Sequence, residues 1–203
     1  MARVRDVEIH EVPEALRPTY ARFASEYGPF LNQVKVFAHR PPALEHVMGL
    51  LLDLAEAALL PKRYLEIALV AVSKLNGCAY CVAHHTPRLV DQGLAPETVA
   101  RILEPDCPGL DEVDKLVRDY AVQVSTKPQY LRDAVFEALK KHFDEAEIVE
   151  LTLRIALCGF FNRFNDALQI GMEEGVIEDM LARGARREDL PEHEAAPAAA
   201  AGE

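Results

Sequence analysis

The chain of 203 residues lacks several features that mark common classes of protein. It has no tryptophan, and its 22 Lys and Arg residues are outnumbered by 33 Asp and Glu residues, which gives a formal net charge of −11. A nucleic-acid-binding surface needs a basic face that neutralises phosphate, so this charge argues against a nucleic-acid partner. The same charge opposes docking on an anionic membrane surface.

Long apolar runs are also missing. The stretch GLLLDLAEAALL is interrupted by Asp53 and Glu56, whereas a membrane helix needs about 20 predominantly apolar residues. The start, MARVRDVEIHEVPEAL, has no apolar stretch after its positive charges, as a signal peptide would. We therefore expect no membrane association and a cytoplasmic location. In that compartment a close cysteine pair is more often catalytic or metal-binding than structural.

Patterns typical of strands are scarce. Only VRDVEIHEV alternates, and one short segment does not make a sheet. Apolar residues instead recur at three- and four-residue spacing, which predicts helices and an all-α fold class. The predicted helices cover residues 13–26, 42–60, 61–75, 78–92, 96–103, 110–125, 130–143 and a long segment from 146 onward.

Local signals set the expected helix ends. Asn76-Gly77 is a helix-breaking dipeptide, and Pro87 should kink the 78–92 helix or start a second one. Residues 126–129 and 144–147 have the pattern of capping boxes. From residue 183 the chain becomes charged and Ala-rich without a periodic apolar face. We therefore predict one domain over 1–182 and a disordered tail over 183–203.

The sequence contains a weak internal echo. Glu66 precedes two cysteines by twelve and fifteen residues, and Glu150 precedes Asn162 and Asn165 by the same spacings. A two-fold repeat of a helical unit would explain this, and so would a chance alignment of two amphipathic helices. Both explanations stay open at the level of sequence.

The stretch EIALVAVSKLNGCAYCVAHH, which begins at Glu66, carries the chemistry. If a helix begins after its Asn-Gly dipeptide, Cys78, Cys81 and His85 lie one turn apart on one face. The unpaired N–H groups of a first helical turn favour a thiolate, which is the nucleophile in peroxide reduction and disulfide exchange. His85 can take the thiol proton, directly or through a water, and Glu66 can orient its imidazole.

Other interpretations of these residues stay open. Glu66 could be an ordinary surface residue. His84 also lies near Cys81, although the helical face favours His85. Tyr80 is predicted to be a packing aromatic rather than a proton donor. The remaining cysteines, at positions 107 and 158, lie in a Pro/Gly loop and in an apolar helix, and we interpret both as inert.

Metal and nucleotide cofactors are not expected. A zinc site could use the two cysteines and one histidine, but structural zinc needs four ligands, usually from two separated pairs, and no second cluster is present. A thioredoxin fold would place Cys-x-x-Cys after a strand. No Gly-rich phosphate loop follows a strand, so reducing equivalents must come from another protein or a small thiol.

The spacing of Glu, eleven residues, Cys-x-x-Cys, three residues and His resembles the alkyl hydroperoxidase D family, within the carboxymuconolactone decarboxylase superfamily. Glu66, Cys78, Cys81 and His85 fill this signature without a spacing error, and the words NGCAYC and NRFNDAL are also similar to the family. The resemblance covers roughly residues 28–175. It implies a helical bundle of the alkyl hydroperoxidase D-like type that assembles as a homo-oligomer, commonly a trimer or hexamer.

The resemblance also implies roles. Cys81 would be the peroxidatic cysteine, Cys78 the resolving cysteine, and His85 with Glu66 the proton relay of an antioxidant, peroxiredoxin-type oxidoreductase. The substrate would be a hydroperoxide. The reductant would be a dithiol, which in the hydroperoxidase proper is carried by a lipoyl-bearing protein. This chain departs from that pattern at Tyr80, where the hydroperoxidase proper has a histidine, and the departure puts the full relay and the lipoyl partner in doubt.

Two other functions stay open. One is an acid–base enzyme of the carboxymuconolactone decarboxylase type, in which His85 and Glu66 act and the thiols are incidental. The lactone decarboxylases lack the cysteine pair, so its presence here argues against this function. The other is a zinc-binding or redox-sensing interaction protein.

Overall fold

The computed structural model describes residues 2–190, and within this range every regular element is helical, as predicted. The α-helices run over Arg17–Arg22 (α1), Leu31–Phe37 (α2), Pro41–Ala43 (α3), Gly49–Ala57 (α4), Lys62–Leu75 (α5), Ala79–Asp91 (α6), Pro96–Ala100 (α7), Glu112–Thr126 (α8), Asp133–Leu139 (α9), Glu145–Leu168 (α10) and Val176–Ala182 (α11). Short π-helical turns at Phe23–Tyr27 and Leu44–Met48 continue α1 and join α3 to α4.

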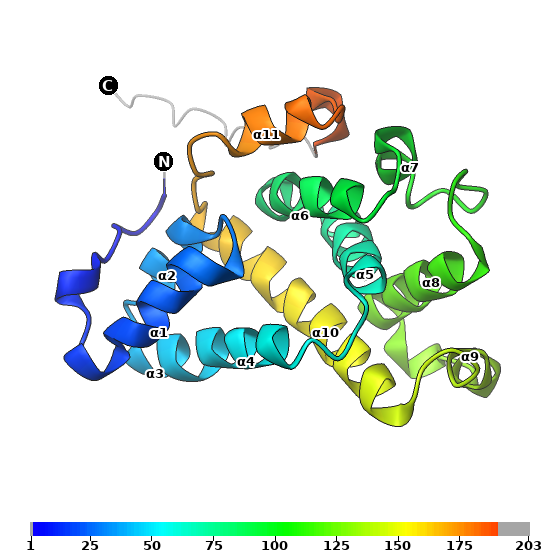
Figure 1. The fold of residues 1–203 in the computed structure, drawn as a ribbon, viewed down its shortest axis with the longest axis horizontal. Helices are drawn as coiled ribbons and strands as arrows, with labels where there is room; N and C mark the ends of the chain where they lie inside the picture. The colour runs from blue at the N-terminus through cyan, green and yellow to red at the C-terminus, as the bar shows by residue number, and fades with distance from the viewer. Residues whose placement is uncertain (1, 191–203) are drawn as a thin grey trace, which may run out of the picture.

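The long helix α10 crosses the molecule diagonally and separates two groups of helices (Figure 1). The N-terminal helices α1 to α4 lie on one side of it, and α7, α8 and α9 lie on the other. Helices α5 and α6 pack against each other and against α10, and α11 lies on α6. The thiol-bearing helix α6 is therefore enclosed from several directions.

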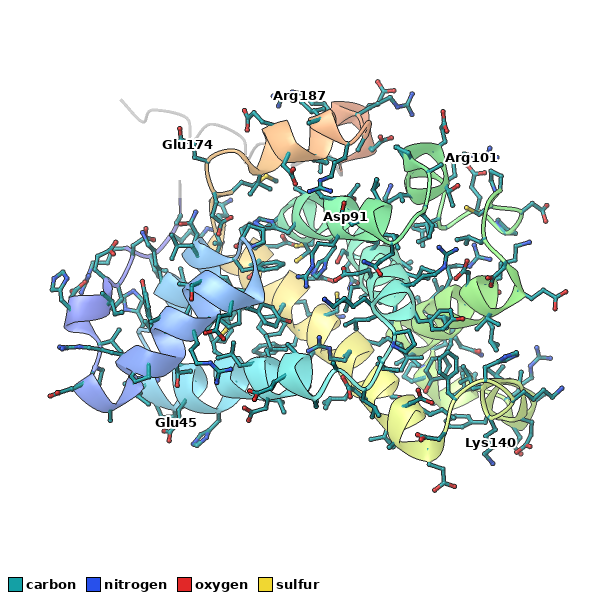
Figure 2. All side chains as sticks on the ribbon, in the orientation of Figure 1. Glu45, Asp91, Arg101, Lys140, Glu174 and Arg187 are labelled. Atoms are coloured by element: carbon teal, nitrogen blue, oxygen red, sulfur yellow. The ribbon has the colours of Figure 1, made fainter. Side chains whose placement is uncertain are left out.

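Two apolar cores meet at this central position. One core joins α5, α8 and α10, with Ile67, Tyr120 and Leu151 almost completely buried. The other joins the N-terminal helices to α6 and α10, and it includes Cys78 and Cys81. Most charged side chains lie on the outside, as the labelled Glu45 and Lys140 show in Figure 2. No helix within residues 2–190 has both the length and the apolar character needed to cross a membrane.

Several predicted helix ends are confirmed. Asp144 and Glu147 form the predicted capping box, each side chain accepting a bond from the other residue's backbone N–H at 2.8 Å. The Asn76-Gly77 dipeptide ends α5, and Gly77 has a φ of 71°, which favours glycine. The prediction that Pro87 could start a second helix is wrong, because Pro87 lies inside the continuous helix α6.

The predicted capping box at 126–129 is wrong. Thr126 is the last residue of α8, and its hydroxyl donates to the carbonyl of Val122 at 2.8 Å instead of capping a new helix. A 3₁₀ turn at Pro128–Tyr130 follows, and α9 begins only at Asp133. The α8 pattern extends through Thr126, so its hydroxyl is used within that helix.

The equal spacings after Glu66 and Glu150 do not belong to equal structures. The first segment is two helices, α5 and α6, separated by the Asn-Gly turn, whereas the second lies within the continuous helix α10. Residues 183–190 of the predicted tail contain a 3₁₀ turn at Arg187–Asp189, and Ala185 is buried. The remainder of that tail, 191–203, lies outside the described residues.

Candidate active site

The two cysteines of the Cys-x-x-Cys pair meet at the start of α6. Cys78 has an extended backbone and is the N-cap residue, not the first helical residue, and its sulfur accepts a bond from the backbone N–H of Cys81 at 3.4 Å. The Cys78 thiol donates to the Cys81 sulfur across 2.8 Å. A disulfide needs about 2.05 Å between sulfurs, so a small movement of this turn would close one.

The surroundings of Cys81 favour its thiolate. The hydrogen bond from Cys78, with further bonds from the Asn162 and Asn165 side chains, holds the pKa of the Cys81 thiol below its ordinary value despite burial. The Asn165 amide lies 3.3 Å from the Cys81 sulfur, and its own carbonyl accepts from Gln33 at 3.0 Å. The pKa of Cys78 is raised, because Cys78 is the donor in the shared hydrogen bond and is buried. Cys81 is thus the better nucleophile of the two.

Glu66 is buried and not a surface residue. It is 3% exposed on α5, and its carboxylate accepts from His85 Nδ1 at 2.8 Å and pairs with Arg88 Nε at 3.0 Å, both on α6. Burial acts to raise its pKa, but the charges and hydrogen bonds of these partners outweigh burial and hold the pKa below its ordinary value. Burial lowers the pKa of His85. The pair is therefore a carboxylate and a neutral imidazole whose Nε2 is free to accept a proton.

A cavity of about 40 Å³ brings Cys81 and His85 together. Apolar side chains form most of its wall, including Tyr27, Phe30 and Phe161, and Arg154 also lines it. A volume of this size has room for roughly three water molecules. A water can thus lie between the thiol and the imidazole, which are one helical turn apart.

His84 faces away from this cavity, into a second buried network. Its Nδ1 lies 2.6 Å from the Tyr80 carbonyl, and its Nε2 lies 2.7 Å from the Glu173 carboxylate. Both ring nitrogens of His84 therefore lie within hydrogen-bond distance of an oxygen acceptor. The Tyr80 hydroxyl donates to the other Glu173 oxygen at 2.8 Å, so Tyr80 is a hydrogen-bond donor as well as a packing aromatic.

The other two cysteines are also buried. Cys158 on α10 lines the same cavity, and burial raises its pKa to about 12. Cys107 lies in the loop after α7, and burial raises its pKa as well. Both thiols are therefore protonated near neutral pH and poorly nucleophilic.

The structure adds residues that the sequence reasoning missed. These are Gln33, Asn165, Arg88 and Arg154, which lie on α2, α6 and α10. Asn165 alone had a signal, because it occupies the position of Cys81 in the internal echo, and the two side chains in fact touch. Within residues 2–190, no three His, Cys, Asp or Glu side chains are grouped so that they could hold a metal ion.

Comparison with known proteins agrees with this architecture. Residues 41–108, which include the whole Glu66–His85 signature, match the Carboxymuconolactone decarboxylase family. The uncharacterised protein YnjA of Escherichia coli is 23% identical over 165 residues, which cover 80% of this chain and 90% of that protein.

Solved structures show the same fold. The alkylhydroperoxidase AhpD core of an uncharacterised peroxidase-related protein from Ralstonia eutropha superposes with a TM-score of 0.71 at 21% identity, covering 87% of this chain and 94% of the other. The debrominase Bmp8, in a cysteine-to-alanine variant bound to 2,3,4-tribromopyrrole, gives 0.72 at 21% identity, with 89% and 96% covered. The chain therefore has an AhpD-like fold.

The hydrogen bond between the two thiols predicts a pH profile. We expect the rate of Cys81 alkylation by iodoacetamide to rise with pH through the Cys81 pKa and to level off above it, with a midpoint below the ordinary thiol value. Cys78→Ser keeps a donor and should move this midpoint little. Cys78→Ala removes the donor and should raise it by about one unit or more. Mass spectrometry of the alkylated Cys81 peptide measures both, and equal midpoints in the two variants would contradict the assignment.

Proposed function

We propose that this carboxymuconolactone decarboxylase family protein is a thiol-dependent peroxidase and disulfide oxidoreductase. The observation that carries the proposal is the position of the Cys81 thiol at the cavity wall, with the Cys78 sulfur 2.8 Å behind it. Cys78 is fully buried and does not line the cavity. Cys81 is then the sulfur that meets a substrate, and Cys78 is the sulfur that resolves the product.

The first step forms a sulfenic acid. The Cys81 thiolate attacks the outer oxygen of a hydroperoxide, an S–O bond forms, and the O–O bond breaks. The leaving alkoxide takes a proton and departs as an alcohol. His85, having accepted the thiol proton on Nε2, returns it at this point, while Glu66 stabilises the transient imidazolium.

The second step forms the disulfide. The Cys78 sulfur attacks the Cys81 sulfur, the S–O bond breaks, and hydroxide leaves as water after taking the Cys78 proton. An external dithiol then reduces the disulfide and is itself oxidised to a disulfide. The net reaction converts a hydroperoxide and a dithiol into an alcohol, water and a disulfide. A lipoyl-bearing protein is one dithiol of suitable chemistry.

A second candidate substrate class is a halogenated aromatic ring. The aromatic wall of the cavity, with Tyr27, Phe30 and Phe161, favours a flat ring, and the debrominase Bmp8 shares the fold. The thiolate would attack the halogen, the carbon would take a proton, and Cys78 would displace halide to give the same disulfide. Both reactions use the same two electrons of the thiol pair.

The homo-oligomeric state belongs to the same proposal. Residues on one face of α10 are exposed at alternating spacings of four and three, and they include Val149, Leu153, Ala156 and Phe160. Val149 is 66% exposed and Phe160 is 43% exposed. This regular apolar stripe supports packing against a second copy.

Substitution of the two cysteines separates their roles. We expect Cys81→Ser to abolish oxidation by tert-butyl hydroperoxide, because the attacking thiolate is removed. Cys78→Ser should react with one equivalent of peroxide and stop at a Cys81 sulfenic acid, which dimedone traps for mass spectrometry. Wild-type protein should instead lose two thiols and form a Cys78–Cys81 disulfide. Unchanged turnover in Cys81→Ser would overturn the proposal.

Glu66→Gln tests the proton relay. The variant keeps the size of the side chain but removes the charge that stabilises a protonated His85, so peroxide-dependent oxidation of Cys81 should slow by about tenfold or more. Glu56→Gln, at an exposed carboxylate on α4, is the matched control and should be silent. The rate of thiol loss in a stopped assay measures both. A normal rate in Glu66→Gln would remove Glu66 from the mechanism.

The exposed stripe on α10 predicts self-association. Leu153→Glu combined with Phe160→Glu should lower the mass seen by size-exclusion chromatography with light scattering, because two charges would enter the interface. Tyr130→Glu changes a more exposed aromatic side chain away from α10 and should leave the mass unchanged. A monomeric wild-type chain, or an unchanged mass in the double variant, would exclude this interface.

A further inference from the structure

The guanidinium of Arg154 is a buried charge in the wall of the proposed catalytic cavity. Arg154 lies on α10, its residue is 5% exposed, and it lines the cavity together with Cys81 and His85. Little of this arginine is exposed, so its charge is largely removed from water. Its presence calls for a partner.

The described residues provide only a partial one, because the Tyr27 hydroxyl interacts with the Arg154 side chain while two guanidinium nitrogens stay unpaired. Arg154 Nε and Nη1 are buried nitrogens without a hydrogen-bond partner, and within residues 2–190 no carboxylate lies at ion-pair distance from Arg154. The equally buried Arg118 shows the usual arrangement, since it donates to the carbonyls of Ile102 and Glu104 and pairs with Asp119. Buried donors without acceptors are costly, and a buried cation more so.

The carboxylates near Arg154 either bind other residues or form no ion pair with it. Glu66 accepts from His85 and pairs with Arg88, although the charge of Arg154 contributes to its lowered pKa. Glu150 lies one turn earlier on α10 and lines a neighbouring cleft with Arg154, but no ion pair joins the two. Two nitrogens of the guanidinium are thus left for a group that enters the cavity.

We infer that Arg154 binds an anionic oxygen of the substrate, so that the hydroperoxide reduced here is small, mainly apolar and carries a carboxylate. The hydroperoxide group of this substrate rests on the proposed function, whereas its carboxylate group does not. A carboxylate supplies acceptor lone pairs to the guanidinium and neutralises its buried charge. The apolar wall then contacts the carbon skeleton, and the hydroperoxide is directed toward Cys81 from a fixed anchor.

A matched pair of substrates tests the anchor. We expect wild-type Cys81 to react about 10- to 100-fold faster with 3-hydroperoxypropanoate than with butyl hydroperoxide, as charge-assisted hydrogen bonds commonly provide. Arg154→Gln should remove this preference by slowing only the anionic substrate. Arg163→Gln, on the same helix with its guanidinium bonded to the Gly159 carbonyl, is the control and should retain it.

Two results would overturn the inference. Equal rates for both substrates in wild type would show that the carboxylate is not recognised. If Arg154→Gln slowed the oxidation of Cys81 equally with both substrates, Arg154 would act on the leaving oxygen of the hydroperoxide or would have a structural role. Thermal unfolding checks the fold, and Arg154→Gln should be at least as stable as wild type because it removes a buried, unpaired charge.

A binding measurement separates this inference from the peroxidase proposal. Propanoate, titrated into the reduced protein and followed by calorimetry, should bind to wild type and to Arg163→Gln, and should lose at least tenfold in affinity for Arg154→Gln. If neither hydroperoxide oxidises Cys81 but propanoate binds in this way, the peroxidase proposal fails and the anion site stands. If propanoate does not bind to wild type, the anion site fails whatever the peroxidase result.

Discussion

The site depends on one buried carboxylate, Glu66. This residue lies in an apolar stretch of α5, where an unpaired charge would cost several kcal/mol. Its two partners, His85 and Arg88, both come from α6, so satisfying the carboxylate fixes the rotation of α6 against α5. Cys81 lies one turn before His85 and consequently faces the same cavity. The position of the Cys81 thiol on α6 therefore follows from the pairing of the Glu66 charge on α5.

The groups around the thiol are neutral, and this matters for its chemistry. The Cys78 thiol and the Asn165 amide stabilise the Cys81 thiolate by hydrogen bonds without placing a fixed cation on the sulfur. A thiolate that is stabilised too strongly loses nucleophilicity as its pKa falls. The cations of the site, Arg88 and Arg154, are instead placed near Glu66 and along the cavity wall. The thiol can therefore be ionised and still reactive.

The site residues that could be predicted from the sequence lie close together in the chain. The segment from Glu66 to His85 consists of two adjacent helices joined by one turn. Helical periodicity was therefore enough to place Glu66, Cys81 and His85 close together. Gln33 and Arg154 reach the cavity from distant segments, and Glu173 reaches the neighbouring network of His84 in the same way. No pattern near these three residues indicates where their side chains point. The failed capping box at Thr126 has a similar cause, because the pattern of a cap does not reveal that the preceding helix extends far enough to use the same residue.

The side chains of α6 have partners on two different faces, and this explains the role of Tyr80, the residue at which the chain departs from the family that it resembles. Burial and the charge of Glu173 raise the pKa of Tyr80 well above its ordinary value, so its hydroxyl keeps its proton and donates it to Glu173. His84 completes that network on the face turned away from the cavity. A residue held in this way cannot take a proton from Cys81. In the proposed mechanism, proton transfer at the thiol therefore falls to His85 and Glu66. Tyr80 instead ties the segment after α10 to the helix that carries the cysteines.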